Sequence, residues 1–510
     1  MQQECIQLPM YRGMQLDEIV NKEGVANARY GRQFHRLLNR LKNPDELDCD
    51  VPKSLNAELR DYQHFGFQWL RTLRYYQLGG ILADDMGLGK TLQSIAFILS
   101  LFEENKNIKP ALIVAPASLV YNWKNEFQKF APTLNVEVLI GSPQERIDKI
   151  KNQQLPNVWI KSYPTLRQDS EFYNEYAFST LILDEAQTIK NYLTKTAKAV
   201  REIQAETVIA LSGTPIENSV DELWSIFQTV MPNFFPSQKV FRQFEPEKIA
   251  RMIRPFLLRR IKKDVVKELP DKIETVQYST LNEQQKKLYL AYLEKIRQET
   301  RESLETDGFK KSQIKILAGL TRLRQLCCHP GLFLEDYTED SGKLKQLLEI
   351  LEPAVENGRR ILIFSQFTSM LSIVKEKLQH LGVDYFYLDG QTKPKDRVDM
   401  VEQFNQGTGN VFLLSLKAGN TGLNLTGADT VILYDLWWNP AVEEQAAGRA
   451  HRIGQKNVVQ VIRLIAQGTI EEKIYELQQS KKELIDTVLD SGNQATTKLS
   501  EEEIREILNL

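Results

Sequence analysis

The stretch LADDMGLGKTLQS contains the end of a phosphate-binding loop, in Gly87, Gly89, Lys90 and Thr91. The general pattern, G-x-x-x-x-G-K-[ST], has a glycine where this chain has Asp84. Glycines let backbone N–H groups close on phosphate oxygens at a helix N-terminus, while the lysine meets the β- and γ-phosphates and the hydroxyl ligates Mg²⁺. These residues predict a nucleotide site. A glycine-rich turn that binds nothing is the alternative for this stretch alone.

Two acids follow a run that is typical of a buried strand. In TLILDEAQTIKN, Asp184 and Glu185 come directly after it. The first carboxylate can hold Mg²⁺ through water, and its neighbour can orient a water for attack on the γ-phosphate. Two solvated acids that begin a helix are the alternative for this motif in isolation. Together with the glycine loop, the pair predicts nucleotide hydrolysis.

Two arginines lie far downstream, in EEQAAGRAHRIGQ. Arg449 and Arg452 are three residues apart, so a helix would place them on one face. An arginine donated to the γ-phosphate from another domain stabilises transition-state charge and links hydrolysis to domain closure. Ordinary surface arginines are the alternative for any lone pair.

The elements that must position these residues alternate between strand and helix. Short runs rich in β-branched residues are ALIVAP, NVEVLI, NVWIKS, TLILDEA and TVIALSG, and later RRILIFSQ, VDYFYLDG, NVFLLSL, DTVILYD and VVQVIRLI. Such runs are typical of parallel sheets with helical crossovers, whose ligands lie at the carboxyl ends of the strands. Between the two sets, NEQQKKLYLAYLEKIRQETRESLE predicts an amphipathic helix. The sequence therefore predicts two α/β units joined by a helical segment.

Composition bounds the function. A chain of 510 residues predicts two or more domains, and 42% hydrophobic with 26% charged residues is typical of globular proteins. Four cysteines and the absence of a signal sequence or an apolar run of membrane-spanning length predict an intracellular protein. Adjacent Cys327, Cys328 and His329 make a poor tetrahedral zinc site, and buried thiols are expected instead.

The motifs together resemble the SWI/SNF family of ATP-dependent DNA translocases in helicase superfamily two. LRDYQHFGFQWL is similar to the family's Q motif, and LADDMGLGKT is its own form of the phosphate loop, with an acid at the first glycine position. Further stretches resemble motifs Ia to VI: IVAPASLVYNWKNEF, KSYPTLRQD, LILDEAQTIKN, LSGTPIENSVDELWSIF, ILIFSQFTSML, LLSLKAGNTGLNLTGAD and YDLWWNPAVEEQAAGRAHRIGQ. The match keeps motif order over residues 55–485. The DEAQ and GTPIEN spellings indicate the prokaryotic branch.

The resemblance implies an α/β fold of two RecA-like parallel-sheet lobes in tandem, with a helical insertion between them and helical terminal extensions. The domains expected from it are a mostly helical lead-in (residues 1–54), lobe 1 (55–247), a helical protrusion (248–342), lobe 2 (343–480) and a C-terminal helical brace (481–510).

The resemblance also assigns roles. The expected catalytic residues are Lys90, Asp184, Glu185, Arg449 and Arg452. The expected ATP-binding residues are Gln63, Asp85, Met86, Gly87, Leu88, Gly89, Lys90, Thr91 and Gly422, and Mg²⁺ would be held by Thr91 and, through water, by Asp184. The expected DNA contacts are Ser162, Lys417, Thr421 and Trp437, and residues 213–215 would sense the γ-phosphate.

The implied activity is ATP-driven translocation along double-stranded DNA without strand separation, which remodels or displaces bound protein or DNA structures. A strand-separating or RNA-directed helicase and a non-catalytic DNA-binding scaffold are the alternatives. Partners would be duplex DNA and a protein roadblock or accessory targeting subunit, with no membrane, in a cytoplasmic, nucleoid-associated setting. Relatives in the prokaryotic branch often carry a long N-terminal region, so a motor fragment or a compact subunit is expected.

Overall fold

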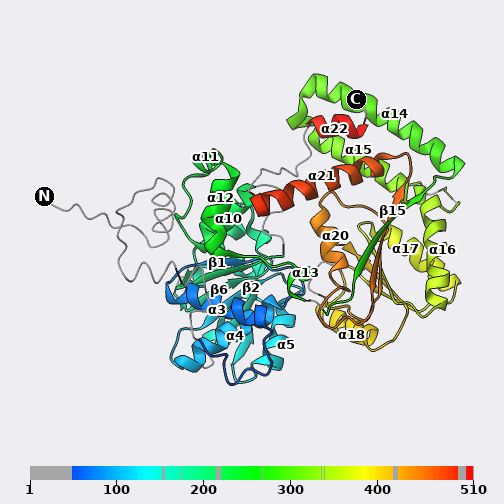
Figure 1. Ribbon diagram of the computed structural model, residues 1–510. Helices are drawn as coiled ribbons and strands as arrows, with labels where there is room; N and C mark the ends of the chain where they lie inside the picture. The colour runs from blue at the N-terminus through cyan, green and yellow to red at the C-terminus, as the bar shows by residue number, and fades with distance from the viewer. Residues whose placement is uncertain are drawn as a thin grey trace. The chain divides into compact units, whose positions relative to one another are not determined.

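The computed structural model describes residues 39, 49–151, 155–173, 175–213, 220–266, 268–334, 336–337, 339–416, 423–491 and 501–508. Most of the predicted lead-in, residues 1–54, lies outside them. The described chain forms two compact units (Figure 1). Described residues within 1–267 and 484–496 belong to the first, and those within 268–483 and 497–510 belong to the second.

The first unit is built on a seven-stranded sheet, all of whose pairings are parallel. In sheet order its strands are β3 (Val136–Val138), β4 (Val158–Ser162), β2 (Ala111–Ala115), β6 (Thr180–Leu183), β8 (Val208–Leu211), β1 (Gly80–Leu82) and β9 (Leu257–Leu258). A separate parallel pair is formed by β5 (Ala177–Phe178) and β7 (Gln204–Ala205). The central strands β2 and β6 are buried along their whole length, as expected of a sheet covered on both faces.

Helices cover both faces of this sheet. The helices of the unit are α3 (Asp61–Tyr75), α4 (Lys90–Glu104), α5 (Val120–Phe130), α6 (Pro143–Lys151), α7 (Tyr163–Gln168), α8 (Ser170–Tyr173), α9 (Lys195–Arg201), α10 (Val220–Val230), α11 (Gln238–Phe241), α12 (Pro246–Ile253) and α13 (Lys262–Val265), with 3₁₀ turns η2 (Ala186–Ile189) and η3 (Arg254–Phe256). Figure 1 shows α3, α4 and α5 on one face and α10 on the other.

The second unit has a six-stranded sheet, again with parallel pairings throughout. In sheet order its strands are β10 (Lys272–Ser279), β15 (Val459–Ala466), β14 (Thr430–Leu433), β11 (Ile361–Ser365), β13 (Val411–Ser415) and β12 (Tyr385–Leu388). Its helices are α14 (Glu283–Asp307), α15 (Phe309–Cys328), α16 (Gly342–Glu356), α17 (Thr368–His380), α18 (Pro394–Asn405), α20 (Pro440–Ala447), α21 (Ile470–Ser491) and α22 (Glu501–Leu508), with the 3₁₀ turn η4 (Pro330–Leu332).

Alternating side chains of the strands β11 to β14 serve two different cores. Leu362 and Phe364 of β11 join the cluster that contains α18 and α20 residues, while Ile361 and Ile363 join the cluster that contains α16 and α17 residues. This period of two explains why these strands read as continuous apolar runs, because both faces of the sheet are buried.

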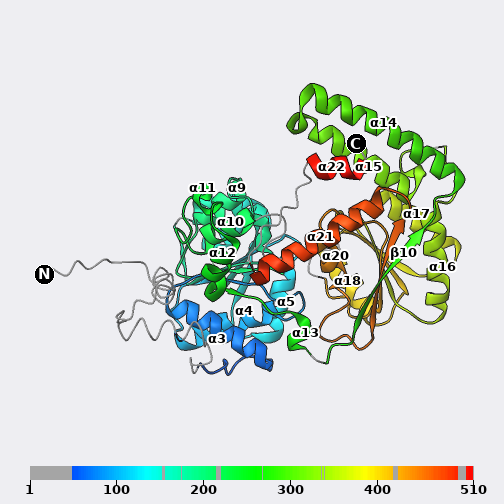
Figure 2. The same cartoon turned by 45° about the horizontal axis from the view of Figure 1, so that its top comes forward.

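The predicted helical insertion is present as α14 and α15. Figures 1 and 2 show these helices side by side, with α22 next to α15, and all three contribute to one apolar cluster. Within the described residues, no helix has the length and apolarity needed to cross a membrane. Four strands were not predicted: β5, β7 and β9, which have only two residues each, and β10, several of whose side chains are exposed.

Candidate nucleotide-binding site

The phosphate loop joins β1 to α4 and depends on glycine at two positions. Gly87 and Gly89 have φ values of 89° and 78°, in the left-handed region that side chains disfavour. Gly89 is the N-cap of α4, and a Cβ built on it would lie 2.5 Å from Nε2 of Gln63. The loop therefore brings backbone N–H groups to the start of a 15-residue helix, which is the arrangement that favours phosphate.

Lys90 begins that helix, and its ammonium turns back into the loop. Nζ donates to the carbonyl oxygens of Asp84 at 2.5 Å and Asp85 at 3.3 Å. Burial lowers the pKa of Lys90, although Asp84, Glu185 and Asp184 act in the opposite direction. The ammonium is thus held by two loop carbonyls, and the charges of the three carboxylates favour its protonated form.

Gln63 lies against the same loop from α3. Its Nε2 donates to the carbonyl of Leu88 at 3.3 Å, and the Tyr62 hydroxyl donates to that oxygen at 3.2 Å. Its Oε1 accepts from the backbone N–H of Arg60 in a capping box. The contact to adenine expected of Gln63 stays a prediction, but its position at the loop agrees with a role in nucleotide binding.

The two predicted acids stand at the end of β6, with both oxygens of Asp184 held. Oδ2 accepts from the indole N–H of Trp123 at 2.8 Å, and Oδ1 accepts from the backbone N–H of Glu185 at 3.0 Å. Burial, and then the charge of Glu185, raises the pKa of Asp184 to about 7, which the Trp123 hydrogen bond and Lys90 partly oppose. Glu185 itself has φ 47°, a strained value for a residue with a side chain.

Gln187 links the acids to the LSG segment that follows β8. Its Nε2 donates to Oε2 of Glu185 at 2.8 Å, and its Oε1 accepts from the Ser212 hydroxyl at 3.0 Å. A Cβ built on Gly213 would lie 3.9 Å from Nζ of Lys90 and from the backbone N of Met86. The first part of this segment therefore reaches the phosphate loop, while residues 214–219 lie outside the described residues.

The contact of the remaining loop residues with a nucleotide stays a prediction. Asp85 accepts a hydrogen bond at Oδ2 from the backbone N–H of Lys262 at 3.0 Å, Leu88 offers its carbonyl as above, and Thr91 lies in the first turn of α4. Gly422 lies outside the described residues.

Arg449 and Arg452 do not share a helix face, contrary to the prediction. Helix α20 ends at Ala447, Gly448 is its C-cap, and both arginines lie in the turns that follow. The Arg449 side chain is buried, and Nε of Arg452 donates to the Gly448 carbonyl at 2.8 Å. Gly448 itself keeps a right-handed backbone, with φ −63°, and the three-residue spacing alone does not reveal that the helix ends here.

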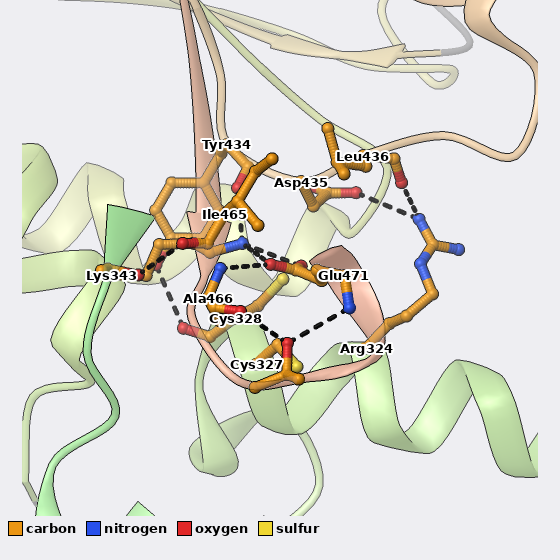
Figure 3. Close-up of polar contacts among 12 residues, drawn as sticks. Arg324, Cys327, Cys328, Lys343, Tyr434, Asp435, Leu436, Ile465, Ala466 and Glu471 are labelled. Atoms are coloured by element: carbon orange, nitrogen blue, oxygen red, sulfur yellow. Dashed lines mark hydrogen bonds and ion pairs between the residues drawn. The ribbon is translucent and has the colours of Figure 1, made fainter. Parts of the chain in front are cut away.

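A buried polar network holds the end of β14, near these arginines in the sequence (Figure 3). Nζ of Lys343 donates to both carboxylate oxygens of Glu471 at 2.8 and 2.6 Å and to the Tyr434 carbonyl at 3.1 Å. Burial acts to lower the pKa of Lys343, but the Glu471 carboxylate outweighs it and the pKa is raised. Arg324 donates to the Leu436 carbonyl and lies 3.8 Å from Asp435.

The cysteines beside this network are buried, as predicted. Burial raises the pKa of the Cys327 and Cys328 thiols. In the part of the chain that the structure describes, no group of three or more His, Cys, Asp or Glu side chains could hold a metal ion.

The predicted DNA contacts are only partly described. Ser162 is buried, and its hydroxyl caps α7 through Thr165. Trp437 is half-buried, and its backbone N–H donates to Oε1 of Glu443 at 2.8 Å. Lys417 and Thr421 lie outside the described residues, and contact with DNA stays a prediction for all four.

Sequence reasoning missed two residues of the site, Trp123 and Arg260. Trp123 lies in the quoted stretch IVAPASLVYNWKNEF, but nothing in its spacing says that its indole reaches Asp184. Arg260 forms a bidentate ion pair with Asp84. The signal that pointed to such a partner was Asp84 itself, because a carboxylate in a buried loop needs one.

The donor set fits a magnesium nucleotide. Left-handed glycines at a helix start, the Lys90 ammonium, the Thr91 hydroxyl and an oriented Asp184 carboxylate are the groups that phosphates and a hard cation prefer. Two parallel α/β units with this loop in the first define the class of helicase-like nucleotide-binding proteins.

Comparison with known proteins gives the family. The model of the SNF2-related domain matches residues 62–332, that of the helicase conserved C-terminal domain matches residues 342–454, and one described as bacterial SNF2 helicase associated matches residues 1–52. The chain belongs to the SNF2-related family. The bacterial model confirms the predicted prokaryotic branch.

Two curated relatives are similar to the chain over most of its length. The chain is 40% identical over 475 residues to an uncharacterized ATP-dependent helicase of Mycoplasma pneumoniae, covering 91% of this chain and 45% of the relative. It is 37% identical over 522 residues to the putative ATP-dependent helicase/translocase YwqA of Bacillus subtilis, covering 98% and 56%. A solved Sulfolobus solfataricus SWI2/SNF2 ATPase core in complex with dsDNA is 36% identical, with 90% and 98% covered and a TM-score of 0.43. The chain thus spans about half the length of these two curated relatives.

Proposed function

We propose that this chain is the motor of a DNA-dependent ATPase that translocates along double-stranded DNA without separating its strands. The observation that carries the proposal is the link between the glycine loop and the acid pair of the first unit. A Cβ on Gly213 would lie 3.9 Å from Nζ of Lys90, and the neighbouring Ser212 is joined through Gln187 to Glu185. In a non-catalytic scaffold, the strained backbone of Glu185 and the fixed orientation of the half-buried Asp184 would have no task to offset their cost in stability.

Each residue of the candidate site in the first unit has a proposed part in ATP hydrolysis. The N–H groups around Gly87 and Gly89 and the Lys90 ammonium bind the phosphates, and Gln63 contacts the base. Thr91 and, through water, Asp184 would hold Mg²⁺, which supplies charge neutralisation on the phosphates when bound. Glu185, fixed by Gln187, orients the attacking water, and Ser212 relays the state of the site to the segment after β8.

The second unit is proposed to supply Arg449 and Arg452 to the transition state. Two guanidinium groups would stabilise the charge that develops on the γ-phosphoryl oxygens, so hydrolysis would depend on both units. Gly422 is expected to bind the nucleotide from the second unit.

Duplex DNA is proposed as the track, bound through its phosphates by Ser162, Lys417, Thr421 and Trp437. Phosphate contacts carry no base information, so binding should be independent of sequence and should weaken steeply with salt. The net charge of −2 means that any basic surface must be local. The motor would displace a protein roadblock or act with a targeting subunit, on DNA of the nucleoid.

The test is the steady-state ATPase rate with no polynucleotide, duplex DNA, single-stranded DNA and RNA, with Lys90→Ala as the blank. The proposal expects stimulation mainly by duplex DNA, abolished in the variant. Stimulation by RNA or single strands alone would favour a strand-separating helicase instead. Absence of turnover with every polynucleotide would favour a scaffold.

A further inference from the structure

The acid that replaces the first glycine of the phosphate-loop pattern is completely buried. Asp84 has 0% of its surface exposed. An ionised carboxylate in that position is strongly unfavourable unless a cation and hydrogen-bond donors compensate it. Its partner therefore matters to the conformation of the loop.

That partner is Arg260, which lies 176 positions further along the chain. Its Nε donates to Oδ1 of Asp84 at 2.8 Å and its Nη2 donates to Oδ2, so the pair is bidentate. Only 12% of the Arg260 side chain is exposed. A planar, partly desolvated fork on a carboxylate is the strongest and most directional form of ion pair.

The same guanidinium contacts two further elements of the nucleotide site. Its Nη1 donates to the carbonyl of Tyr62 on α3, next to Gln63, and its Nη2 donates to Oε1 of Gln93 on α4 at 2.8 Å. Gln93 in turn donates to Asp84 and to the Leu88 carbonyl, each at 3.3 Å. The Arg260 guanidinium thus joins α3, which carries Gln63, to the phosphate loop and to α4.

Gly66 makes room for this network. A Cβ built on this residue of α3 would lie 1.9 Å from Oε1 of Gln93 and 2.8 Å from Nη2 of Arg260. Even alanine would displace one of these polar groups. The glycine in the middle of a helix, otherwise unfavourable, is explained by the close approach of the arginine.

Backbone hydrogen bonds hold the Arg260 segment along the loop. The N–H groups of Ala83 and Asp85 donate to the carbonyls of Leu258 at 2.7 Å and Arg260 at 2.9 Å. This segment extends β9 and runs on to residue 267, after which the chain enters the second unit. The stretch of the first unit that leads into the second is therefore hydrogen-bonded to the phosphate loop.

We propose that Arg260 is a positioning residue of the nucleotide site. The side chain of Asp84 is held by Arg260, and its carbonyl oxygen accepts from Nζ of Lys90 at 2.5 Å, so Arg260 acts through Asp84 on the lysine that meets the phosphates. The carboxylate stands where other phosphate loops have glycine because it takes this ion pair. The identity of the nucleotide as ATP rests on the proposed function.

The test uses the full 510-residue chain and the affinity for a fluorescent ATP analogue with Mg²⁺, measured at equilibrium. Arg260→Gln should weaken binding about tenfold, the loss expected when a bidentate charged pair is removed. Arg242→Gln is the matched control: Arg242 forms a bidentate pair with Asp221 in the same unit, but 62% of its side chain is exposed, and binding should not change. Wild-type affinity in Arg260→Gln would overturn the proposal.

A double-mutant cycle with Lys90 separates positioning from simple stabilisation. Because Arg260 is proposed to act through the loop, Lys90→Ala should cost less affinity in the Arg260→Gln background than in the wild type. Fully additive losses of affinity would contradict the positioning role of Arg260. So would losses of affinity that only accompany a lower melting temperature.

Asp84→Asn with Arg260→Gln keeps the test decisive should the single variant fail to fold. The double variant removes both charges of the Asp84–Arg260 pair, and the proposal expects it to bind nucleotide more weakly than the wild type, whereas equal affinity would overturn it. If the wild type binds the analogue but shows no DNA-stimulated turnover, the proposed function is rejected. The positioning role of Arg260 is then decided by the binding affinities of the variants alone. A wild type that binds no nucleotide would reject both.

Discussion

The indole N–H of Trp123 donates to Oδ2 of Asp184 at 2.8 Å. Trp123 is 1% exposed and comes from α5, whereas Asp184 follows β6. Since the other carboxylate oxygen accepts from the Glu185 backbone, the orientation of the proposed magnesium acid is fixed on both sides. Outer contacts of this kind set how well a carboxylate serves a metal.

Replacing Trp123 by Phe keeps an aromatic ring but removes the donor. We expect kcat of the DNA-stimulated ATPase to fall about tenfold, because a charge-assisted hydrogen bond that orients Asp184 is lost. The Mg²⁺ concentration for half-maximal rate should rise. Trp159→Phe is the control, because Nε1 of this buried tryptophan has no hydrogen-bond partner among the described residues. Equal kcat in wild type and Trp123→Phe would contradict the role.

Asp184 should make stability depend on pH in a defined direction. Its pKa is raised by burial to about 7, above the unfolded value, so its protonated form stabilises the fold at low pH and this contribution is lost as the pH rises through about 7. Asp184→Asn removes the titration. Its melting temperature relative to wild type should therefore be higher at pH 8 than at pH 5.5, by about 2 °C or more. A relative melting temperature that does not change with pH would show that the carboxylate is not destabilised by burial.

Arg449→Lys and Arg452→Lys test the second unit. Lysine keeps the charge but loses the planar fork, so kcat should fall by about two orders of magnitude or more if each guanidinium stabilises the transition state. The affinity for the fluorescent nucleotide should change little. Arg359→Lys serves as the control, since Arg359 is 45% exposed and pairs with Asp429 at 3.6 Å. A rise in KM without loss of kcat would assign the arginines to ground-state binding.

Lys343 and Glu471 test the network of the second unit. Both side chains are 0% exposed, so Lys343→Met leaves a buried carboxylate without its cation and should lower the free energy of unfolding by about 3–5 kcal/mol. Adding Glu471→Gln should restore much of this loss, because the uncompensated charge disappears. Lys377→Met, which breaks the half-exposed pair with Asp340, should change stability by less than about 1 kcal/mol. Chemical denaturation measures all four proteins, and a double variant no more stable than Lys343→Met would contradict the account.

Much of the fold was predictable because apolar runs record burial on both faces of a sheet. The ten runs quoted from the sequence correspond to β2, β3, β4, β6, β8 and to β11–β15. Helix α14 was predicted from its amphipathic period. By contrast β10, with the sequence KIETVQYS, lies at the sheet edge with several exposed side chains, so no apolar run marks it.

The site was predictable where its residues are neighbours in sequence. Gly89, Lys90 and Thr91 share one loop, and Asp184 adjoins Glu185. Contacts between distant segments leave no local trace, so the reach of Trp123 to Asp184 and of Arg260 to Asp84 appears only in the fold. The helix predicted to carry Arg449 was wrong because a C-cap at Gly448 ends α20 before it.

Displacement of a third strand from a DNA triplex, measured beside unwinding of a forked duplex, tests the central claim most directly. With ATP, the account predicts that the third strand is released while the forked duplex stays paired, and that Lys90→Ala does neither. Separation of the forked duplex, or a triplex that stays intact while ATP is hydrolysed, would contradict translocation along double-stranded DNA without strand separation.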